Sequence, residues 1–154
     1  MAARHVIPAI AVALAGAPAV AGPVTSYEPG TIVAALQNAG YKAKLSKDDD
    51  GDPQIDTASD GNDIHIALSG CNKGSSCNQI EFLVFWKCGD ELKKCQKVQD
   101  EWNGAEMFTG SLIIDEQIGL YRHLLLDKEG ISGALFIRNF DLFTKEAVEL
   151  MSKF

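Results

Sequence analysis

The 154-residue sequence contains no run of lysine or arginine, and its 21 acidic residues outnumber its 14 basic ones. Proteins that bind nucleic acid neutralise phosphate groups with clustered basic side chains. Segments that bind an anionic membrane surface need a similar cluster. The missing basic run and the formal net charge of −7 therefore argue against both kinds of partner.

Signature motifs of catalysis are also missing. There is no G-x-S-x-G, no H-E-x-x-H, no glycine-rich phosphate loop and no C-x-x-C redox pair. Only His65 and His123 follow the first 21 residues, and both fall in predicted strands. We therefore predict a protein that is not an enzyme and has no catalytic residue, cofactor or metal site. The alternative is a periplasmic ligand-binding protein or hydrolase with an unfamiliar site, for which these histidines and nearby acids are the candidates.

The first 21 residues have the pattern of an export signal. Arg4 and His5 are followed by an alanine-rich apolar stretch, 7–20, which is too short to span a bilayer. Ala19-Val20-Ala21 then supplies a small-x-small cleavage pattern before Gly22. A buried N-terminal helix is the alternative, which two prolines and a glycine disfavour. We predict a signal peptide at 1–21, a periplasmic or secreted location and no membrane span in the mature chain.

Four cysteines fit an exported protein, because disulfides persist in oxidising compartments. Three pairings are possible. We favour Cys71 with Cys77 and Cys88 with Cys95, since each pair flanks a polar loop bounded by regular structure. The alternative is a zinc site, but zinc ligands usually come in closer C-x2-4-C pairs. Each short ring should stabilise the fold by roughly 2 kcal/mol.

The stretch from Asn62 to Cys88 predicts a hairpin at the centre of the fold. Apolar and polar residues alternate as far as Ser69, the pattern of a half-buried strand. The segment 80–86 is apolar on both faces, as a central strand is, and the polar loop 70–77 joins the two strands. Trp86 lies in this apolar strand and is predicted to be in the core.

A helix and two strands are predicted before the hairpin. The helix begins at Pro29 and ends at Gly40, and the strands cover 41–45 and 54–58. Four aspartates lie in the turn Asp48–Asp52, but an EF-hand loop with Gly51 sixth would need acids where serine and threonine stand. We interpret the segment as a solvated turn and leave open a looser surface calcium site.

The C-terminal part predicts a charged loop at 89–94, a short helix at 96–103, strands at 105–114 and 117–126, and a long helix capped by Ser132. Within the short helix, Trp102 is either a core residue or an exposed anchor for a partner. One apolar stripe marks the long helix and is typical of packing on a sheet: Phe136, Phe140, Phe143, Ala147, Leu150, Met151 and Phe154.

Strands joined by short turns form antiparallel pairs, and helices can cover one face of the resulting sheet. The fold class predicted from this order of elements is α+β. At 154 residues, with 46% hydrophobic and 23% charged residues, a single domain is expected.

Several short motifs resemble the YbjN-domain family of bacterial sensory transduction regulators. They are Gly40-Tyr41 after the first helix, Asp50-Gly51-Asp52-Pro53-Gln54-Ile55, Gly70-Cys71, Glu101-Trp102-Asn103, and Gly130-Ile131-Ser132 before the last helix. The resemblance covers roughly Thr31 to Phe154, which leaves 22–30 as a lead-in. Gln99 departs from the asparagine that the family often carries before its tryptophan-asparagine pair.

Membership would imply an antiparallel sheet covered by helices, similar to type III secretion chaperones, with no recognised cofactor and no catalytic residues. The leader and the cysteine pairs resemble an exported subset of the family. We therefore expect a non-catalytic, exported protein-interaction or regulatory module. Its partner is expected to be an unidentified protein, a second copy in a homodimer being one option.

Overall fold

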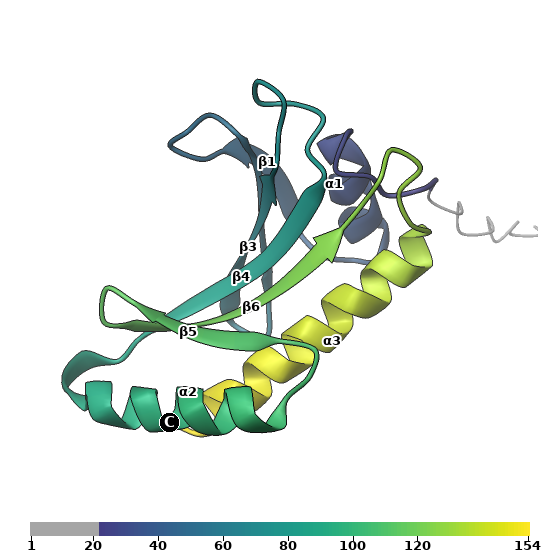
Figure 1. The fold of residues 1–154 in the computed structure, drawn as a ribbon. Coiled ribbons are helices and arrows are strands. Elements are labelled where there is room, and N and C mark those ends of the chain that lie inside the picture. The colour runs from purple at the N-terminus through teal and green to yellow at the C-terminus, as the bar shows by residue number, and fades with distance from the viewer. Residues whose placement is uncertain (1–21) are drawn as a thin grey trace, which may run out of the picture.

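A computed structural model describes residues 22–154 and contains one six-stranded antiparallel sheet and three α-helices (Figure 1). The predicted α+β fold is confirmed, whereas the predicted signal peptide lies outside the described residues. The elements, in chain order, are α1 (Pro29–Asn38), β1 (Ala43–Lys47), β2 (Pro53–Ser59), β3 (Asn62–Ser69), β4 (Gln79–Lys87), a 3-10 turn (Gly89–Glu91), α2 (Leu92–Ala105), β5 (Gly110–Ile114), β6 (Gln117–Leu125) and α3 (Gly133–Met151).

The strands lie in the order β1-β2-β3-β4-β6-β5. The first four strands form consecutive hairpins, and β6 then pairs with β4 along its whole length. As a result β5 forms one edge of the sheet and β1 forms the other. Figure 1 shows the three helices gathered on one side of this sheet.

The core lies between the sheet and α3. Phe82 of β4 is fully buried, and its ring centroid is 5.5–5.8 Å from those of Phe136, Phe140 and Phe143. The Ser132 hydroxyl accepts a hydrogen bond from the Leu135 N–H, which confirms the predicted cap of α3. The apolar stripe is confirmed through Leu150, but Met151 and Phe154 are 36% and 38% exposed. The prediction is wrong for these last two, because the helix ends at Met151 and the chain returns to the surface.

Several predicted boundaries differ from the structure, and three of the differences have a local cause. The strand predicted at 41–45 begins at Ala43 instead, because the Tyr41 N–H donates to the Leu36 carbonyl and closes the end of α1. The loop predicted at 89–94 is partly helical, since Leu92 and the two lysines after it are good helix formers. The strand predicted at 105–114 begins only at Gly110, because α2 continues to Ala105 and residues 106–109 connect it to the sheet. In this connection the Phe108 carbonyl accepts a hydrogen bond from Arg122.

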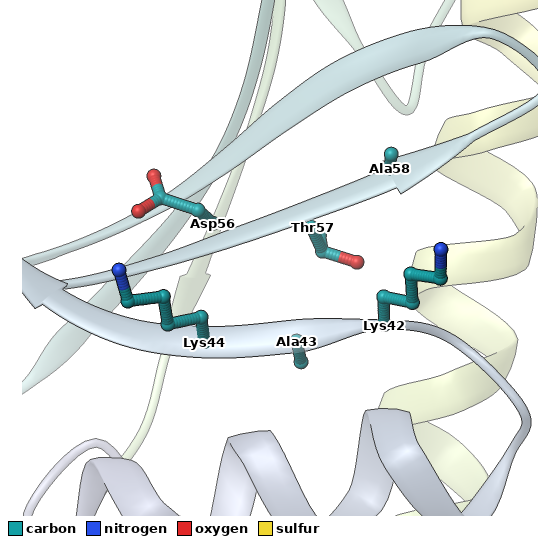
Figure 2. Close-up of a pocket in the computed structure, with 6 residues that line it drawn as sticks. All are labelled: Lys42, Ala43, Lys44, Asp56, Thr57 and Ala58. Carbon is teal, nitrogen blue, oxygen red and sulfur yellow. The ribbon is translucent and has the colours of Figure 1, made fainter.

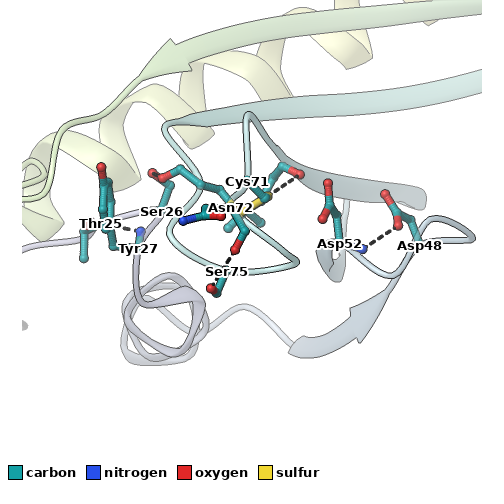
Figure 3. The surroundings of a disulfide bond; sticks show 10 residues. Thr25, Ser26, Tyr27, Asp48, Asp52, Cys71, Asn72 and Ser75 are labelled. Atoms are coloured by element: carbon teal, nitrogen blue, oxygen red, sulfur yellow. Dashed lines mark hydrogen bonds between the residues drawn. A yellow bond between two sulfur atoms is a disulfide. The ribbon is translucent and has the colours of Figure 1, made fainter.

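Both predicted disulfides are present, Cys71–Cys77 and Cys88–Cys95, and no cysteine of the described chain is free. The first closes the loop between β3 and β4, where Asn72 and Ser75 are hydrogen-bonded to each other (Figure 3). The second joins the end of β4 to the first turn of α2. Each bridge therefore fixes a connection rather than the centre of the sheet.

The two tryptophans are placed differently. Trp102 on α2 is 1% exposed and belongs to the core, so it is not an exposed anchor. Its indole Nε1 donates to the Thr109 hydroxyl at 3.1 Å, and that hydroxyl donates to the buried Glu146 carboxylate at 2.6 Å. Trp86 packs against the core but is only partly buried, and its Nε1 donates to Asn62 Oδ1 at 2.9 Å.

Candidate functional site: the open face of the sheet

One face of the sheet is covered by no helix of the described chain (Figure 1). Alternate residues of each strand point to this side, and we call their surface the open face. Residues that form it include Lys44, Ser46, Gln54, Asp56, Ala58, His65, Ala67, Gln79, Glu81, Leu83, Phe85, Gly110, Leu112, Ile114, Gly119, Tyr121, His123 and Leu125. Its side over β1–β3 is polar, and its side over β4–β6 is largely apolar.

The polar side is organised around Asp56. Its carboxylate accepts hydrogen bonds from the Ser46 hydroxyl at 2.8 Å, from Gln54 Nε2 at 2.9 Å and from His65 Nδ1 at 2.9 Å. Burial raises the pKa of Asp56, but these hydrogen bonds, together with the attraction of the histidine, outweigh burial and hold the pKa below its ordinary value. The cluster is therefore built around an ionised carboxylate.

The Asp56 contact sets the tautomer of His65. An ionised carboxylate only accepts hydrogen bonds, so the ring donates from Nδ1, and in the neutral form of the ring Nε2 is then an acceptor. Within residues 22–154, Nε2 has no hydrogen-bond partner, and no serine, threonine or cysteine reaches it. The pair has the geometry of a base held by an acid, but the Ser46 hydroxyl is hydrogen-bonded to Asp56, and within residues 22–154 no nucleophile is hydrogen-bonded to His65 Nε2.

A second histidine pair lies on the same face. His123 Nε2 is 3.1 Å from Glu81 Oε1, and its Nδ1 is 2.8 Å from Gln79 Nε2. Both ring nitrogens are therefore occupied, unlike those of His65. The structure thus brings each predicted candidate histidine next to an acid but in two separate pairs.

The apolar side is a platform made flat by two glycines. A Cβ atom at Gly119 would lie 2.5 Å from the Phe85 ring, and one at Gly110 would lie 2.4 Å from the Tyr121 ring. Each aromatic ring therefore rests directly on strand backbone where a glycine leaves room for it. Leu83 lies between them in the register, opposite Tyr121. The arrangement presents aromatic and aliphatic surface with little relief.

A shallow depression lies at the β1–β2 end of the open face (Figure 2). Lys42, Lys44 and Asp56 rise from one side of the two strands, while Ala43 points to the other side. The depression is open and is not a deep polar pocket.

The aspartates of the β1–β2 turn mainly stabilise the turn itself. Asp48 Oδ1 accepts hydrogen bonds from the backbone N–H groups of Asp50 and Asp52, at 3.1 and 2.8 Å. The turn lies beside the disulfide loop, and Figure 3 shows the two loops together. Within residues 22–154, no group of three or more His, Cys, Asp or Glu side chains could hold a metal ion. No helix there has the length and apolar character needed to cross a membrane.

The Asp56–His65 pair was missed by reading the sequence, although a signal for it exists. Asp60 and Gly61 both have positive φ and form a two-residue hairpin turn, which fixes the pairing of Ser59 with Asn62. Asp56 lies three residues before Ser59, and His65 lies three residues after Asn62. The same antiparallel pairing therefore places Asp56 opposite His65. The Glu81–His123 pair carries no such signal, because 41 residues with an intervening helix separate the two residues.

Comparison with known proteins gives one match to a family model. Residues 28–154 match YbjN, described as "putative bacterial sensory transduction regulator". No curated protein and no solved structure matches the chain. The matched region includes every helix and strand described above.

Proposed function

Since the chain belongs to the YbjN family, we propose that it is a non-catalytic, exported regulatory module that binds a partner protein through the open face. The observation that carries this proposal is the apolar platform of Leu83, Phe85 and Tyr121 on a face that no helix of the described chain covers. The three side chains are half-buried, and solvent-accessible apolar side chains that are grouped in this way are typical of protein-interaction sites.

The polar side of the open face supports a specific partner rather than a general apolar contact. His65 Nε2 and the exposed end of Lys44 offer hydrogen-bonding groups beside the platform. An apolar centre bordered by polar groups is the usual anatomy of a protein interface. The partner should therefore place apolar side chains over β4–β6 and a hydrogen-bond donor near His65.

Two disulfides support the exported location. Cys77 and Cys95 are fully buried in their bridges, and bridges of this kind persist in oxidising compartments. The apolar leader pattern at 1–21 is consistent with the same location.

Affinity capture tests the interaction. The mature, oxidised protein, tagged at its C-terminus, is crosslinked in the periplasm and its partners are identified by mass spectrometry. Leu83→Glu places a charge at the centre of the platform, and Leu135→Glu is the matched control on α3, where the side chain is 47% exposed. We expect one dominant partner that Leu83→Glu loses and Leu135→Glu keeps. Capture that is insensitive to Leu83→Glu would place the partner on another surface and contradict the proposal.

The Asp56–His65 pair favours one alternative, a ligand-binding or hydrolytic site at the polar side. In the neutral ring, Nε2 of His65 is available to accept a proton from a bound molecule. His65→Ala removes this base, and His123→Ala is the control, because both nitrogens of His123 are already occupied. If a phenotype that depends on the wild-type protein is lost with His65→Ala and kept with His123→Ala, the ligand-binding or hydrolytic site is favoured over the interaction module.

A further inference from the structure

We propose that two copies of this protein pair through β1, edge to edge and antiparallel, so that their sheets join into one. The partner in this interaction is a second copy of the chain. The contact uses the edge of the sheet rather than the open face, so it is independent of the function proposed above. Three features of the edge support it.

The two edges of the sheet differ in how they are covered. At the β5 edge, α2 reaches the backbone of Ser111 through Asn103 and Gln99, and three hydrogen bonds are formed. At the β1 edge, one side chain of α1 makes such a contact, Gln37 Nε2 to the Ala43 carbonyl at 3.0 Å. The β1 edge beyond Ala43 is therefore the one that is open to another strand.

The backbone N–H and C=O groups of β1 point toward β2 at one residue and away from β2 at the next. The Asp48 N–H donates to the Asp52 carbonyl across the hairpin, whereas the Ala43 carbonyl accepts from α1. In an antiparallel ladder, alternate residues bond to the same neighbour. Leu45 and Lys47 therefore direct their N–H and C=O groups away from β2. Four backbone groups are thus positioned to bond to a second strand.

The charges along this segment are self-complementary. Lysines stand at 42, 44 and 47 with no acid among them, and aspartates follow at 48, 49, 50 and 52 with no base among them. A two-fold axis beside Ser46 runs the second β1 in the opposite direction. Lys44 of each copy then lies across from Asp48 of the other, and the two contacts are equivalent. The same register pairs Leu45 of each copy with Lys47 of the other.

Lysines on an edge strand usually prevent other strands from adding to it. Here they repel a parallel copy, which would place lysine beside lysine, but attract an antiparallel copy through the aspartates. The side chain of Leu45, which is 48% exposed, would be covered in the same contact. The charge pattern therefore selects one partner and one orientation.

Sedimentation velocity of the mature, oxidised protein tests the pairing. In the same register Lys42 of each copy faces Asp50 of the other, so the acidic variant carries Lys42→Glu and the basic variant carries Asp50→Lys. Asp48 is kept because it stabilises the turn. In either variant alone, like charges face each other at both positions where residue 42 meets residue 50, and we expect the dimer to be weaker than that of the wild type. Mixed in equal amounts, the two variants restore opposite charges at both contacts, so we expect a dimer that contains one copy of each.

A control with the same change of charge as the acidic variant carries Lys93→Glu, which is exposed and lies outside β1, and it should dimerise like the wild type. Leu45→Pro removes an outward N–H that β2 does not use, and it should weaken the dimer with its fold intact by circular dichroism. Added salt should weaken the wild-type dimer, since it screens the charge contacts. A wild type that stays monomeric throughout the concentration series would overturn the proposal. So would a dimer that resists both charge variants but is lost with Leu83→Glu, which would move self-association to the open face.

Discussion

Asn103 and Ser111 are joined by two hydrogen bonds that imitate the pairing of neighbouring strands. The Ser111 N–H donates to Asn103 Oδ1 at 2.7 Å, and Asn103 Nδ2 donates to the Ser111 carbonyl at 2.9 Å. A side-chain amide thus occupies the backbone donor and acceptor that another strand would otherwise use. Asn103 belongs to one of the motifs that resemble the YbjN family. This contact gives it a structural role, because it closes the β5 edge of the sheet.

Replacing Asn103 by alanine should destabilise the fold. The Ser111 N–H would lose its partner, and a backbone group left without one at a partly buried position costs about 1–3 kcal/mol. Gln99 also donates to the Ser111 carbonyl, at 3.2 Å, so the carbonyl keeps one bond and the loss should fall toward the lower end. Urea unfolding measures the change. Asn38→Ala on the exposed end of α1 is the control, and an equal effect of both variants would refute the edge-closing role.

Thr109→Val should lower the free energy of unfolding by more than the small change in side-chain shape suggests. The hydroxyl accepts from the Trp102 indole and donates to Glu146, and all three residues are buried. Valine leaves both partners without this bond in a site of low polarity, for a loss of about 2–4 kcal/mol. Thr31→Val is a comparison at a more exposed threonine that is also hydrogen-bonded. Urea unfolding that shows less than half the predicted loss for Thr109→Val would mean that water replaces the hydroxyl.

Tyr41 should ionise at unusually high pH. Burial raises the pKa of its phenol to about 12, with contributions from its hydrogen bond to Asp141 and from the charges of Asp141 and Asp60. Because the folded-state pKa is above the ordinary tyrosine pKa of 10.0, this contribution to stability is complete below pH 10.0 and is lost as the pH rises toward about 12. Ultraviolet absorbance should show a phenolate step near pH 12 that Tyr41→Phe removes. An unchanged titration curve in that variant would contradict the assignment.

Asp56 should contribute to stability in the opposite pH range. Burial raises the pKa of Asp56, but its hydrogen bonds outweigh burial and hold the pKa below the ordinary aspartate value of 3.8. A depressed pKa in the folded state gives stability that is complete above the unfolded-state value and is lost as the pH falls through the folded-state value. The stability gap between the wild type and Asp56→Asn should therefore be widest near neutral pH and narrow below pH 3.8.

Urea unfolding at a series of pH values measures that gap. Asp49→Asn, in the exposed turn, controls for the loss of a surface charge. A gap that stays constant down to pH 3, or widens there, would mean that the hydrogen bonds to Asp56 do not favour its ionised form.

Local patterns were sufficient to predict most of the fold. The alternation in β3, the apolar run of β4 and the Ser132 cap each depend on neighbours in the sequence, and all three are confirmed. The error at 89–94 arose because charged residues were interpreted as a loop, although lysine is a good helix former. The position of β6 beside β4 could not be predicted, because it depends on packing between segments that are distant in the chain.

The candidate site was predictable only in part. The sequence singled out His65 and His123, and the hairpin turn at Asp60–Gly61 could have assigned Asp56 to the first of them. The flat platform could not be foreseen, since it requires knowing that Gly119 lies opposite Phe85 on a distant strand. This part of the surface is formed by residues of strands that are distant in the sequence, and local periodicity does not specify how those strands pair.

Both disulfides join cysteines that are consecutive in the sequence, the first with the second and the third with the fourth. If the chain is exported amino-terminus first, as proposed above, Cys71 and Cys77 reach the oxidising compartment before either member of the other pair. An oxidant that joins thiols in their order of appearance therefore makes the native bonds directly. Biogenesis of this protein should accordingly require a thiol oxidase but no disulfide isomerase.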